Sequence, residues 1–231
     1  MINKIKSKIS KKVVQDKLKM REFSNSENLK LVCLNKNFNR ILKLYPRVTS
    51  YTEFVTLFNY SFLSSGSIIE IGSYLSYSSV IMASAFQKNE NRKLYAIDPF
   101  EREIGWSNGS SDDWIYKKYS QLQFATELVE KSGLKNNIVF VKGYSNDVIS
   151  YFDQIHDVGM IFIDGNHSYD GCKSDLNLYS PLLLSGGYLL MHDYNCPQHN
   201  GVMKATEEFL LENKNYEKLF LLDSLLVVKK K

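Results

Sequence analysis

From Gly66 onward, short apolar runs alternate with longer amphipathic segments. The apolar runs predict five strands, at Ser67–Ile71, Lys93–Ile97, Ile138–Val141, Val158–Ile163 and Gly187–Met191. The amphipathic segments predict helices over residues 77–88, 113–132, 145–154, 171–184 and 201–214. Strands that alternate with helices are typical of a mainly parallel, doubly wound sheet covered by helices on both faces. The pattern therefore predicts an α/β fold.

The end of the chain departs from this alternation. Tyr216–Leu222 and Leu225–Lys229 are two apolar runs joined by Asp223 and Ser224, which predicts an antiparallel hairpin. Residues 99–112 are the longest stretch without periodicity. Because they follow the second strand, we expect them to lie over the carboxyl edge of the sheet, where a lid could sit.

The beginning of the chain has a different pattern. Ile2, Ile5, Ile9 and Val13 recur at helical spacing among seven lysines, which predicts a basic amphipathic helix over residues 1–20. Such a helix could dock on the body, contact an anionic membrane surface peripherally, or bind a partner. Residues 27–63 also look helical, with a break near Pro46. We therefore divide the chain into a basic N-terminal helical extension, residues 1–63, and a body, residues 64–231.

Charge and composition narrow the class of protein. The 231 residues carry a formal charge of +4, but lysines at the two ends supply the excess and the body is mildly acidic. A nucleic-acid-binding surface is therefore not expected. No apolar run approaches the length of a membrane span, and the first residues lack the apolar core of a secretory signal. Three widely spaced cysteines fit a reducing cytoplasm.

Four of the predicted strands end on or beside an acidic residue. In open α/β sheets, ligands bind beyond the carboxyl ends of the strands, near the switch in strand order. The acids there are Glu70, Asp98, Asp164 and Asp193. Asp98 is placed to accept hydrogen bonds from the two hydroxyls of a ribose. The chain has no Gly-x-Gly-x-x-Gly and no phosphate-binding loop, so a cofactor without phosphate, such as S-adenosylmethionine, fits best.

Asp164 and Asp193 follow two strands that we expect to be neighbours. Two carboxylates that close repel each other unless one is protonated or a cation lies between them. Oxygen ligands favour Mg²⁺, Mn²⁺ or Ca²⁺, and a bound cation lowers the pKa of substrate hydroxyls. The third ligand is either His192 or water.

The motifs at these strand ends resemble those of class I S-adenosylmethionine-dependent methyltransferases, most closely the metal-dependent sugar O-methyltransferases of the macrocin type. They are Glu70-Ile71-Gly72-Ser73-Tyr74, Lys142-Gly143-Tyr144-Ser145, Asp164-Gly165-Asn166-His167 and His192-Asp193-Tyr194. The resemblance implies a Rossmann-like methyltransferase fold over about residues 66–230. It implies cofactor contacts at Glu70, Gly72, Ser73, Tyr74, Ser78, Asp98, Gly143, Ser145 and Asp164. It also implies metal ligation by Asp164, Asp193 and His192, and catalytic roles for His167 and Asp164.

The sequence also gives expectations for individual residues in and near the predicted site. Ser76 stands where the relatives usually have glycine, so its side chain is expected to narrow the cofactor pocket. His167 is either a general base or a residue that holds the cofactor or its loop. His199 is expected to be an ordinary loop residue, and Asp175 a structural residue on an exposed helix face. Trp106 is expected to stack on an acceptor sugar, whereas Trp114 is expected to lie in a helix core.

Together these features predict an O-methyltransferase that uses S-adenosylmethionine and Mg²⁺ or another divalent cation. Its acceptor is expected to be a hydroxyl of a sugar, glycan or similar small molecule, as in polysaccharide or natural-product biosynthesis. Cephalosporin-hydroxylase-like proteins share similar motifs, so a divergent hydroxylase-like metal enzyme stays open. A non-catalytic binding protein on the same fold, and a homo-oligomeric assembly, stay open as well.

Overall fold

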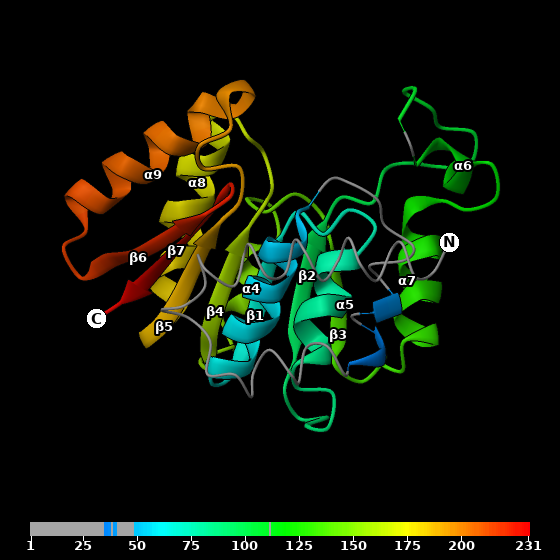
Figure 1. Cartoon of the computed structure of the whole chain (residues 1–231), viewed down its shortest axis with the longest axis horizontal. Helices are drawn as coiled ribbons and strands as arrows, with labels where there is room; N and C mark the ends of the chain where they lie inside the picture. Colours follow the sequence, from blue (N-terminus) through cyan, green and yellow to red (C-terminus); the bar gives the residue numbers. More distant parts are fainter. Residues whose placement is uncertain (1–34, 38, 41–48, 111) are drawn as a thin grey trace, which may run out of the picture.

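The computed structural model describes residues 35–37, 39–40, 49–110 and 112–231. They form a seven-stranded sheet in the order β3-β2-β1-β4-β5-β7-β6 (Figure 1). The strands are β1 (Ser67–Ile71), β2 (Leu94–Asp98), β3 (Ile138–Lys142), β4 (Val158–Ile163), β5 (Leu183–Met191), β6 (Tyr216–Leu222) and β7 (Leu225–Lys230). β1 to β5 pair in parallel, and β7 and β6 are antiparallel at one edge. The predicted parallel sheet with a terminal hairpin is confirmed.

The predicted bounds differ from the observed ones mainly where local capping decides them. The helices are α4 (Tyr51–Leu63), α5 (Tyr77–Ser84), α6 (Asp113–Tyr116), α7 (Gln121–Lys131), α8 (Tyr169–Tyr179) and α9 (Asn200–Glu212). The helix predicted over 113–132 is two helices, because Ser120 caps α7 through a reciprocal capping box with Gln123. The helix predicted over 145–154 is only the short 3₁₀ turn η1 (Ile149–Phe152).

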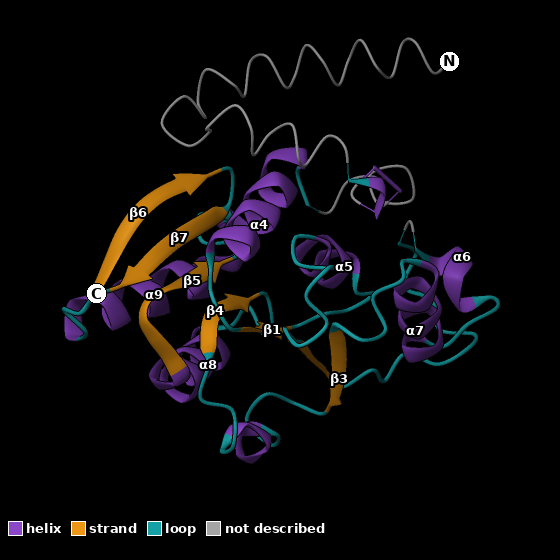
Figure 2. Ribbon diagram, turned by 90° about the horizontal axis from the view of Figure 1, so that it is seen from below, coloured by secondary structure: helices purple, strands orange, loops and turns teal. Residues whose placement is uncertain are grey.

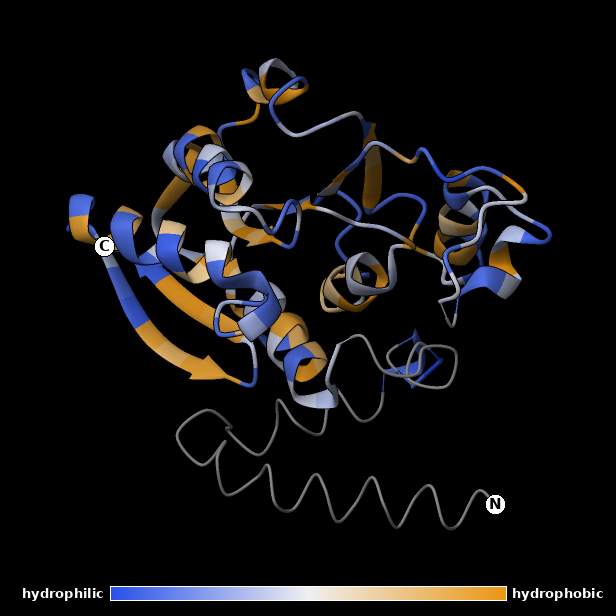
Figure 3. Ribbon diagram, turned by 90° about the horizontal axis from the view of Figure 1, so that it is seen from above, coloured by the Kyte–Doolittle hydropathy of each residue, from blue (hydrophilic) through white to orange (hydrophobic). Residues whose placement is uncertain are grey.

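Helices cover both faces of the sheet (Figure 2). Side chains of α4, α5 and α7 join one face of the strands in a buried cluster, and side chains of α8 and α9 join the other face in a second cluster. β1 and β4 are buried along their whole length, as expected for central strands covered on both faces, and β1 buries Ser67 and Glu70 as well as its isoleucines. Hydrophobic residues concentrate on the sheet and on the helix surfaces that pack on it (Figure 3). This sandwich holds the loops at the carboxyl edge in fixed positions.

α4 belongs to the core of the body. Its residues are apolar on most sides, and Phe54, Val55 and Leu57 are almost fully buried. Ser50 caps its first turn, and the Ser50 hydroxyl also donates to Asp223 in the β6–β7 turn at 2.7 Å. The division into residues 1–63 and 64–231 stays a prediction, because most of residues 1–50 lie outside the described part. The part of the extension that the structure describes includes α4, whose buried side chains share one core with the sheet.

Three further expectations concern the remaining segments. The basic helix over residues 1–20 lies outside the described residues. Trp114 is 54% exposed, so the expectation that it lies in a helix core is wrong: α6 is a single turn, and its buried side is formed by Ile115 and Tyr116. Among the described residues, no helix combines the length and the apolar character that crossing a membrane requires.

Candidate active site

A cavity of about 1220 Å³ lies beyond the carboxyl ends of β1 to β5. The strand order reverses between β1 and β4, so the cavity is at the switch point where α/β proteins bind ligands. Nine residues predicted as site residues line it: Gly72, Tyr74, Asp98, Gly143, Ser145, Asp164, His167, His192 and Asp193. Three others, Glu70, Ser73 and Ser78, are not among the lining residues.

Glu70 supports the loop after β1 from inside the protein. It has no exposed surface, and its two carboxylate oxygens accept hydrogen bonds from the hydroxyls of Ser78 and Ser79 at the start of α5. Burial raises the pKa of Glu70 to about 8, although the two serine hydrogen bonds act in the opposite direction. Glu70 and Ser78 thus tie α5 to β1, next to the loop that faces the cavity.

Gly72 is required by a close approach of two strand ends. Its φ is +86°, and a Cβ at this position would lie 2.1 Å from the backbone oxygen of Asp164. The Asp164 amide in turn donates to the Ile71 carbonyl at 2.9 Å, so β1 and β4 remain paired up to the cavity. The absence of a side chain at Gly72 therefore lets the backbone of Asp164 come this close.

Ser76 adopts the left-handed conformation that favours glycine, with φ of 63°. Its side chain is fully buried, and its hydroxyl has no hydrogen-bond partner among the described residues. Ser76 is absent from the cavity lining, so the expected narrowing of the cofactor pocket is not what the structure shows. The serine affects the conformation of the loop instead.

Asp98 is held rigidly at the end of β2. Its Oδ2 accepts from the Tyr74 amide, and its Oδ1 accepts from the Phe100 amide and the Gln121 side chain, all at 2.8 Å. Burial raises the pKa of Asp98, and these hydrogen bonds oppose the rise. A carboxylate can accept about four hydrogen bonds, so one acceptor position remains for a ligand in the cavity.

The end of β3 is anchored to α8. The Ser145 hydroxyl donates to Asp175, and the Tyr179 hydroxyl donates to the Ser145 carbonyl at 2.7 Å. Asp175 is only 2% exposed and lines the cavity, so the expectation of an exposed residue is wrong. The helix turns this acid inward, and burial raises its pKa to about 6. Gly143 also lines the cavity, with a φ of 151°.

Carboxylates and imidazoles alternate along the side of the cavity that is formed by the segments after β4 and β5. Asp164 lies 3.0 Å from His192 Nδ1 and 3.4 Å from His167 Nε2. Asp193 lies 3.2 Å from His167 Nε2 and 3.6 Å from His192 Nδ1. The structure therefore brings together the four residues predicted for catalysis and metal binding. The pattern of strand ends was sufficient to find them.

The two acids and two imidazoles strongly perturb one another. Hydrogen bonds to Asp164 and Asp193 raise the pKa of His167 to about 9. Burial alone would lower the pKa of His192, but its charge interactions with Asp164 and its carboxylate hydrogen bonds raise it. His167 and His192 in turn hold the pKa of Asp193 well below its usual range. Such coupled shifts at a cavity are typical of functional sites.

The sequence interpretation missed two residues that contact this group: His199, which lines the cavity, and Glu53, which lies behind His192. Glu53 of α4 is buried and faces His192 Nε2 at 3.7 Å. His199 of the turn η3 (Pro197–His199) lies 3.8 Å from Asp193 and stacks on the His167 ring. A Cβ on Gly201 would lie 2.4 Å from the Tyr169 amide, so this glycine lets the starts of α8 and α9 approach and brings His199 inward. The contacts of these two missed residues with His192, Asp193 and His167 are found only in the tertiary structure.

Aromatic side chains surround the side of the cavity next to Asp98. The Arg102 guanidinium lies 4.4 Å from the centre of the Tyr74 ring and 4.3 Å from that of Trp106. Trp106 also packs edge-to-face on Tyr116. Trp106 lines the cavity, but one face of its ring is already covered by Arg102. Its expected stacking on an acceptor sugar stays a prediction.

The donor atoms suit a metal ion in two overlapping groups. One group is Asp164, His192 and Asp193, the set predicted from the sequence, and the other is His167, Asp193 and His199. Within each group the ligand atoms all lie within 4.8 Å of one another. Carboxylate oxygens and imidazole nitrogens both bind divalent cations. The cavity wall thus has the chemistry of a cation site.

A curated viral protein resembles part of this chain. Among curated proteins, the uncharacterized protein R132 of Acanthamoeba polyphaga mimivirus is 34% identical over 62 residues, which are 26% of this chain and 28% of that protein. The chain thus matches less than a third of that relative's length.

Solved structures share the fold over nearly the whole chain. The O-methyltransferase TomG from Streptomyces achromogenes has a TM-score of 0.63 at 16% identity, over 89% of this chain and 96% of that chain. An O-methyltransferase from Bacillus cereus has a TM-score of 0.59 at 15% identity, over 90% and 93% of the two chains. A putative caffeoyl-CoA O-methyltransferase from Staphylococcus aureus has a TM-score of 0.56 at 20% identity, over 96% and 99%.

A family model described as "Methyltransferase domain" matches residues 69–194, which include most of β1, all of β2 to β5 and every residue that lines the cavity except His199. The match confirms the resemblance seen at the strand ends. Because it covers more than half of the chain, and the sheet has the fold of the solved O-methyltransferases, the protein belongs to the methyltransferase-domain family.

Proposed function

We propose that the protein transfers a methyl group from S-adenosylmethionine to a hydroxyl oxygen of a small acceptor, with the help of a divalent cation. One observation carries the proposal. A single cavity at the switch point has a fixed ribose-type acceptor, Asp98, near Gly72, and a pair of carboxylates, Asp164 and Asp193, among imidazoles. The named cofactors of the solved relatives agree with it: the TomG and Bacillus cereus structures contain SAM and SAH.

The cofactor half of the cavity suits S-adenosylmethionine. The remaining acceptor position of Asp98 can receive a ribose hydroxyl, and Gly72 lines the same cavity. Gly143 and Ser145 continue the wall along β3, where an adenine would lie. Ser73, Ser78 and Glu70 act indirectly in this proposal, since they shape and brace the loop and do not line the cavity.

The acceptor half suits a hydroxyl that must lose its proton. In methyl transfer the acceptor oxygen forms a bond to the methyl carbon while the carbon–sulfur bond breaks and its electron pair stays on sulfur. The hydroxyl proton passes to a base, for which Asp164 and His167 are both placed. A divalent cation, when bound beside Asp164 and Asp193, would supply charge that lowers the pKa of the hydroxyl.

A sugar, polyol or glycan is the acceptor class that we favour. The half of the cavity near Asp164 is lined by polar groups such as Asn166 and Asp193, which can orient a polyhydroxylated ligand. The polar lining supports a role in the synthesis of a polysaccharide or natural product. The three widely spaced cysteines support a location in the reducing cytoplasm. Peripheral membrane contact through residues 1–20 and a homo-oligomeric assembly are further proposals, tested by vesicle sedimentation and by light scattering.

Two measurements test the proposed function. Isothermal titration calorimetry with S-adenosylhomocysteine should show saturable binding that Asp98→Asn weakens. Incubation with S-adenosylmethionine and a panel of nucleotide sugars and glycans should give a product heavier by one CH₂, and EDTA should stop its formation. Absence of any cofactor binding would refute the proposed function. EDTA-resistant turnover would refute only the metal dependence.

A further inference from the structure

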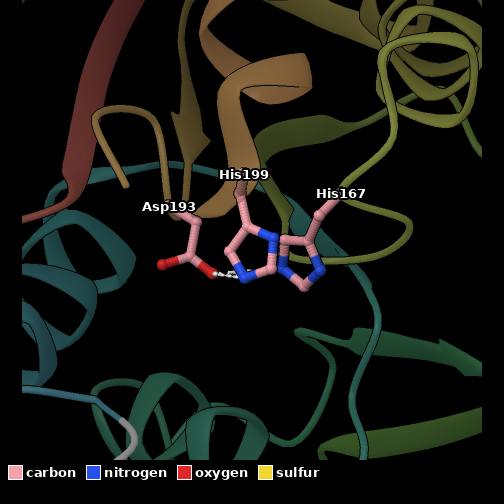
Figure 4. Close-up of side chains that lie close together, drawn as sticks. All are labelled: His167, Asp193 and His199. Carbon is pink, nitrogen blue, oxygen red and sulfur yellow. Dashed lines mark ion pairs between the residues drawn. The ribbon is translucent and has the colours of Figure 1, made fainter. Parts of the chain in front are cut away.

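Two imidazoles and one carboxylate converge where α9 begins. His167 Nε2 lies 3.2 Å, and His199 Nε2 3.8 Å, from the same oxygen, Oδ2 of Asp193. The two rings stack with their centres 4.2 Å apart and their planes 26° apart. Figure 4 shows both rings presenting nitrogen on the side of the Asp193 carboxylate. All three side chains are partly exposed and line the cavity, although Nε2 of His167 itself is buried.

The spacing of these atoms is close to that of ligands around one metal ion. Nitrogen and oxygen ligands lie about 2.0–2.2 Å from a divalent metal, which places neighbouring ligands roughly 3.0–3.5 Å apart. The separations of 3.2 and 3.8 Å need only a small contraction to match it. Asp164 is 3.4 Å from His167 Nε2 and adds an oxygen donor on the other side.

His192 is a poorer ligand than the sequence suggested. Its Nδ1 lies 3.0 Å from Asp164 and its Nε2 lies 3.7 Å from Glu53, so both ring nitrogens face carboxylates. At 3.7 Å the Nε2 makes no hydrogen bond among the described residues, and the ring is held through Nδ1 by Asp164. His192 is also only 6% exposed. Its geometry is that of a residue that positions Asp164.

We propose that His167, Asp193 and His199 bind a divalent transition-metal ion, of the class of Mn²⁺, Co²⁺ or Zn²⁺, in preference to Mg²⁺. Imidazole nitrogen is a borderline donor that suits these ions, whereas Mg²⁺ prefers oxygen ligands and water. The inference extends the cation of the proposed function, on which it rests for its catalytic meaning. It assigns His167 to the metal and so removes it from the candidates for the base that takes the acceptor proton.

Metal titration of the full-length, untagged protein tests this assignment. Transition ions bind more tightly than Mg²⁺ at most protein sites, so the dependence on His199 is more informative than the preference alone. We expect His199→Asn to weaken Co²⁺ binding by about tenfold or more while Mg²⁺ binding changes little. Pulsed electron paramagnetic resonance of the Mn²⁺-loaded protein should detect coordinated imidazole nitrogen, and this signal should diminish in His199→Asn.

His156→Asn is the matched control, since His156 is exposed and is not among the residues that line the cavity. His167→Asn should weaken Co²⁺ binding as His199→Asn does, and metal-free thermal unfolding checks that each variant folds. Equal Co²⁺ affinity in wild type and His199→Asn, or Mn²⁺ without coordinated nitrogen, would overturn the assignment. Titration of the same samples with S-adenosylhomocysteine separates the two proposals. If the cofactor binds but His199→Asn leaves the Co²⁺ affinity unchanged, only this inference fails. If Co²⁺ binding depends on His199 but the cofactor does not bind, only the proposed function fails.

Discussion

Replacement of Ser76 by glycine should stabilise the protein. The left-handed conformation of Ser76, with φ of 63°, costs a residue with a Cβ about 1–2 kcal/mol. Its buried hydroxyl, which has no partner among the described residues, costs about 1–3 kcal/mol more. The greater freedom of glycine in the unfolded chain offsets about 0.5–1 kcal/mol, and the lost burial of the Cβ about 0.8 kcal/mol. These contributions leave a net gain of about 0.2–3.7 kcal/mol, with a central value near 2 kcal/mol.

Thermal and urea unfolding followed by circular dichroism measure this gain. For a chain of this length, 1 kcal/mol corresponds to a rise in Tm of about 2–4 °C. Ser76→Ala is the matched control, because it removes the hydroxyl and keeps the Cβ in the left-handed conformation. It should gain about as much as Ser76→Gly, because relief of the left-handed conformation is offset by the freedom of glycine in the unfolded chain and by the lost burial of the Cβ. The difference between the two variants measures this net backbone contribution. Affinity for S-adenosylhomocysteine should stay unchanged, because Ser76 does not line the cavity. A Tm of Ser76→Gly at or below the wild-type value would refute the reasoning.

Three further predictions follow from the cavity. Gly72→Ala should lower the free energy of unfolding by about 3 kcal/mol or more, since its Cβ would meet the Asp164 carbonyl at 2.1 Å; unfolding in urea measures this, and a loss below about 1 kcal/mol would contradict it. Asp98→Asn should weaken S-adenosylhomocysteine binding about tenfold or more in calorimetry, because an ionised acceptor becomes a neutral amide; equal affinity would exclude Asp98 as the ribose acceptor. Asp175 has a folded-state pKa raised to about 6, so its stabilising contribution is present at low pH and is lost as pH rises through 6. The stability advantage of Asp175→Asn over wild type should therefore grow by about 1–2 kcal/mol between pH 5 and pH 8, and a pH-independent difference would refute the assignment.

The strand ends show how far local pattern predicts this site. The continuous apolar run Val158–Ile163 defined β4 to the residue, because strands buried on both faces admit few polar side chains, and β1 was also predicted to the residue although it contains Ser67 and Glu70. The acids that follow such strands in a parallel sheet emerge at one edge, so Asp98, Asp164 and Asp193 were found from position alone. Helix capping set boundaries that the hydrophobic periodicity did not predict. At Ser120, a capping box begins α7 and so divides one predicted helix into α6 and α7.

Side-chain direction and distant contacts escaped the same reasoning. Glu70 occupies a strand end like the other acids, yet its strand turns it into the protein, where Ser78 and Ser79 hold it. Asp175 is turned inward by α8 for a reason that helical spacing alone did not reveal. In each case the direction depends on packing against another element, which has no local signature.

The sequence by itself determined the order of strands and helices, the terminal hairpin and the acids at the carboxyl edge, because each depends on periodicity or on position along one segment. Only the tertiary structure decided which groups face one another. Glu53 reaches His192 from a helix more than a hundred residues earlier, and His199 reaches His167 because Gly201 lets two helix starts approach. Such contacts arise when a sheet places separate segments side by side, so they depend on distance in space and leave no mark on spacing along the chain.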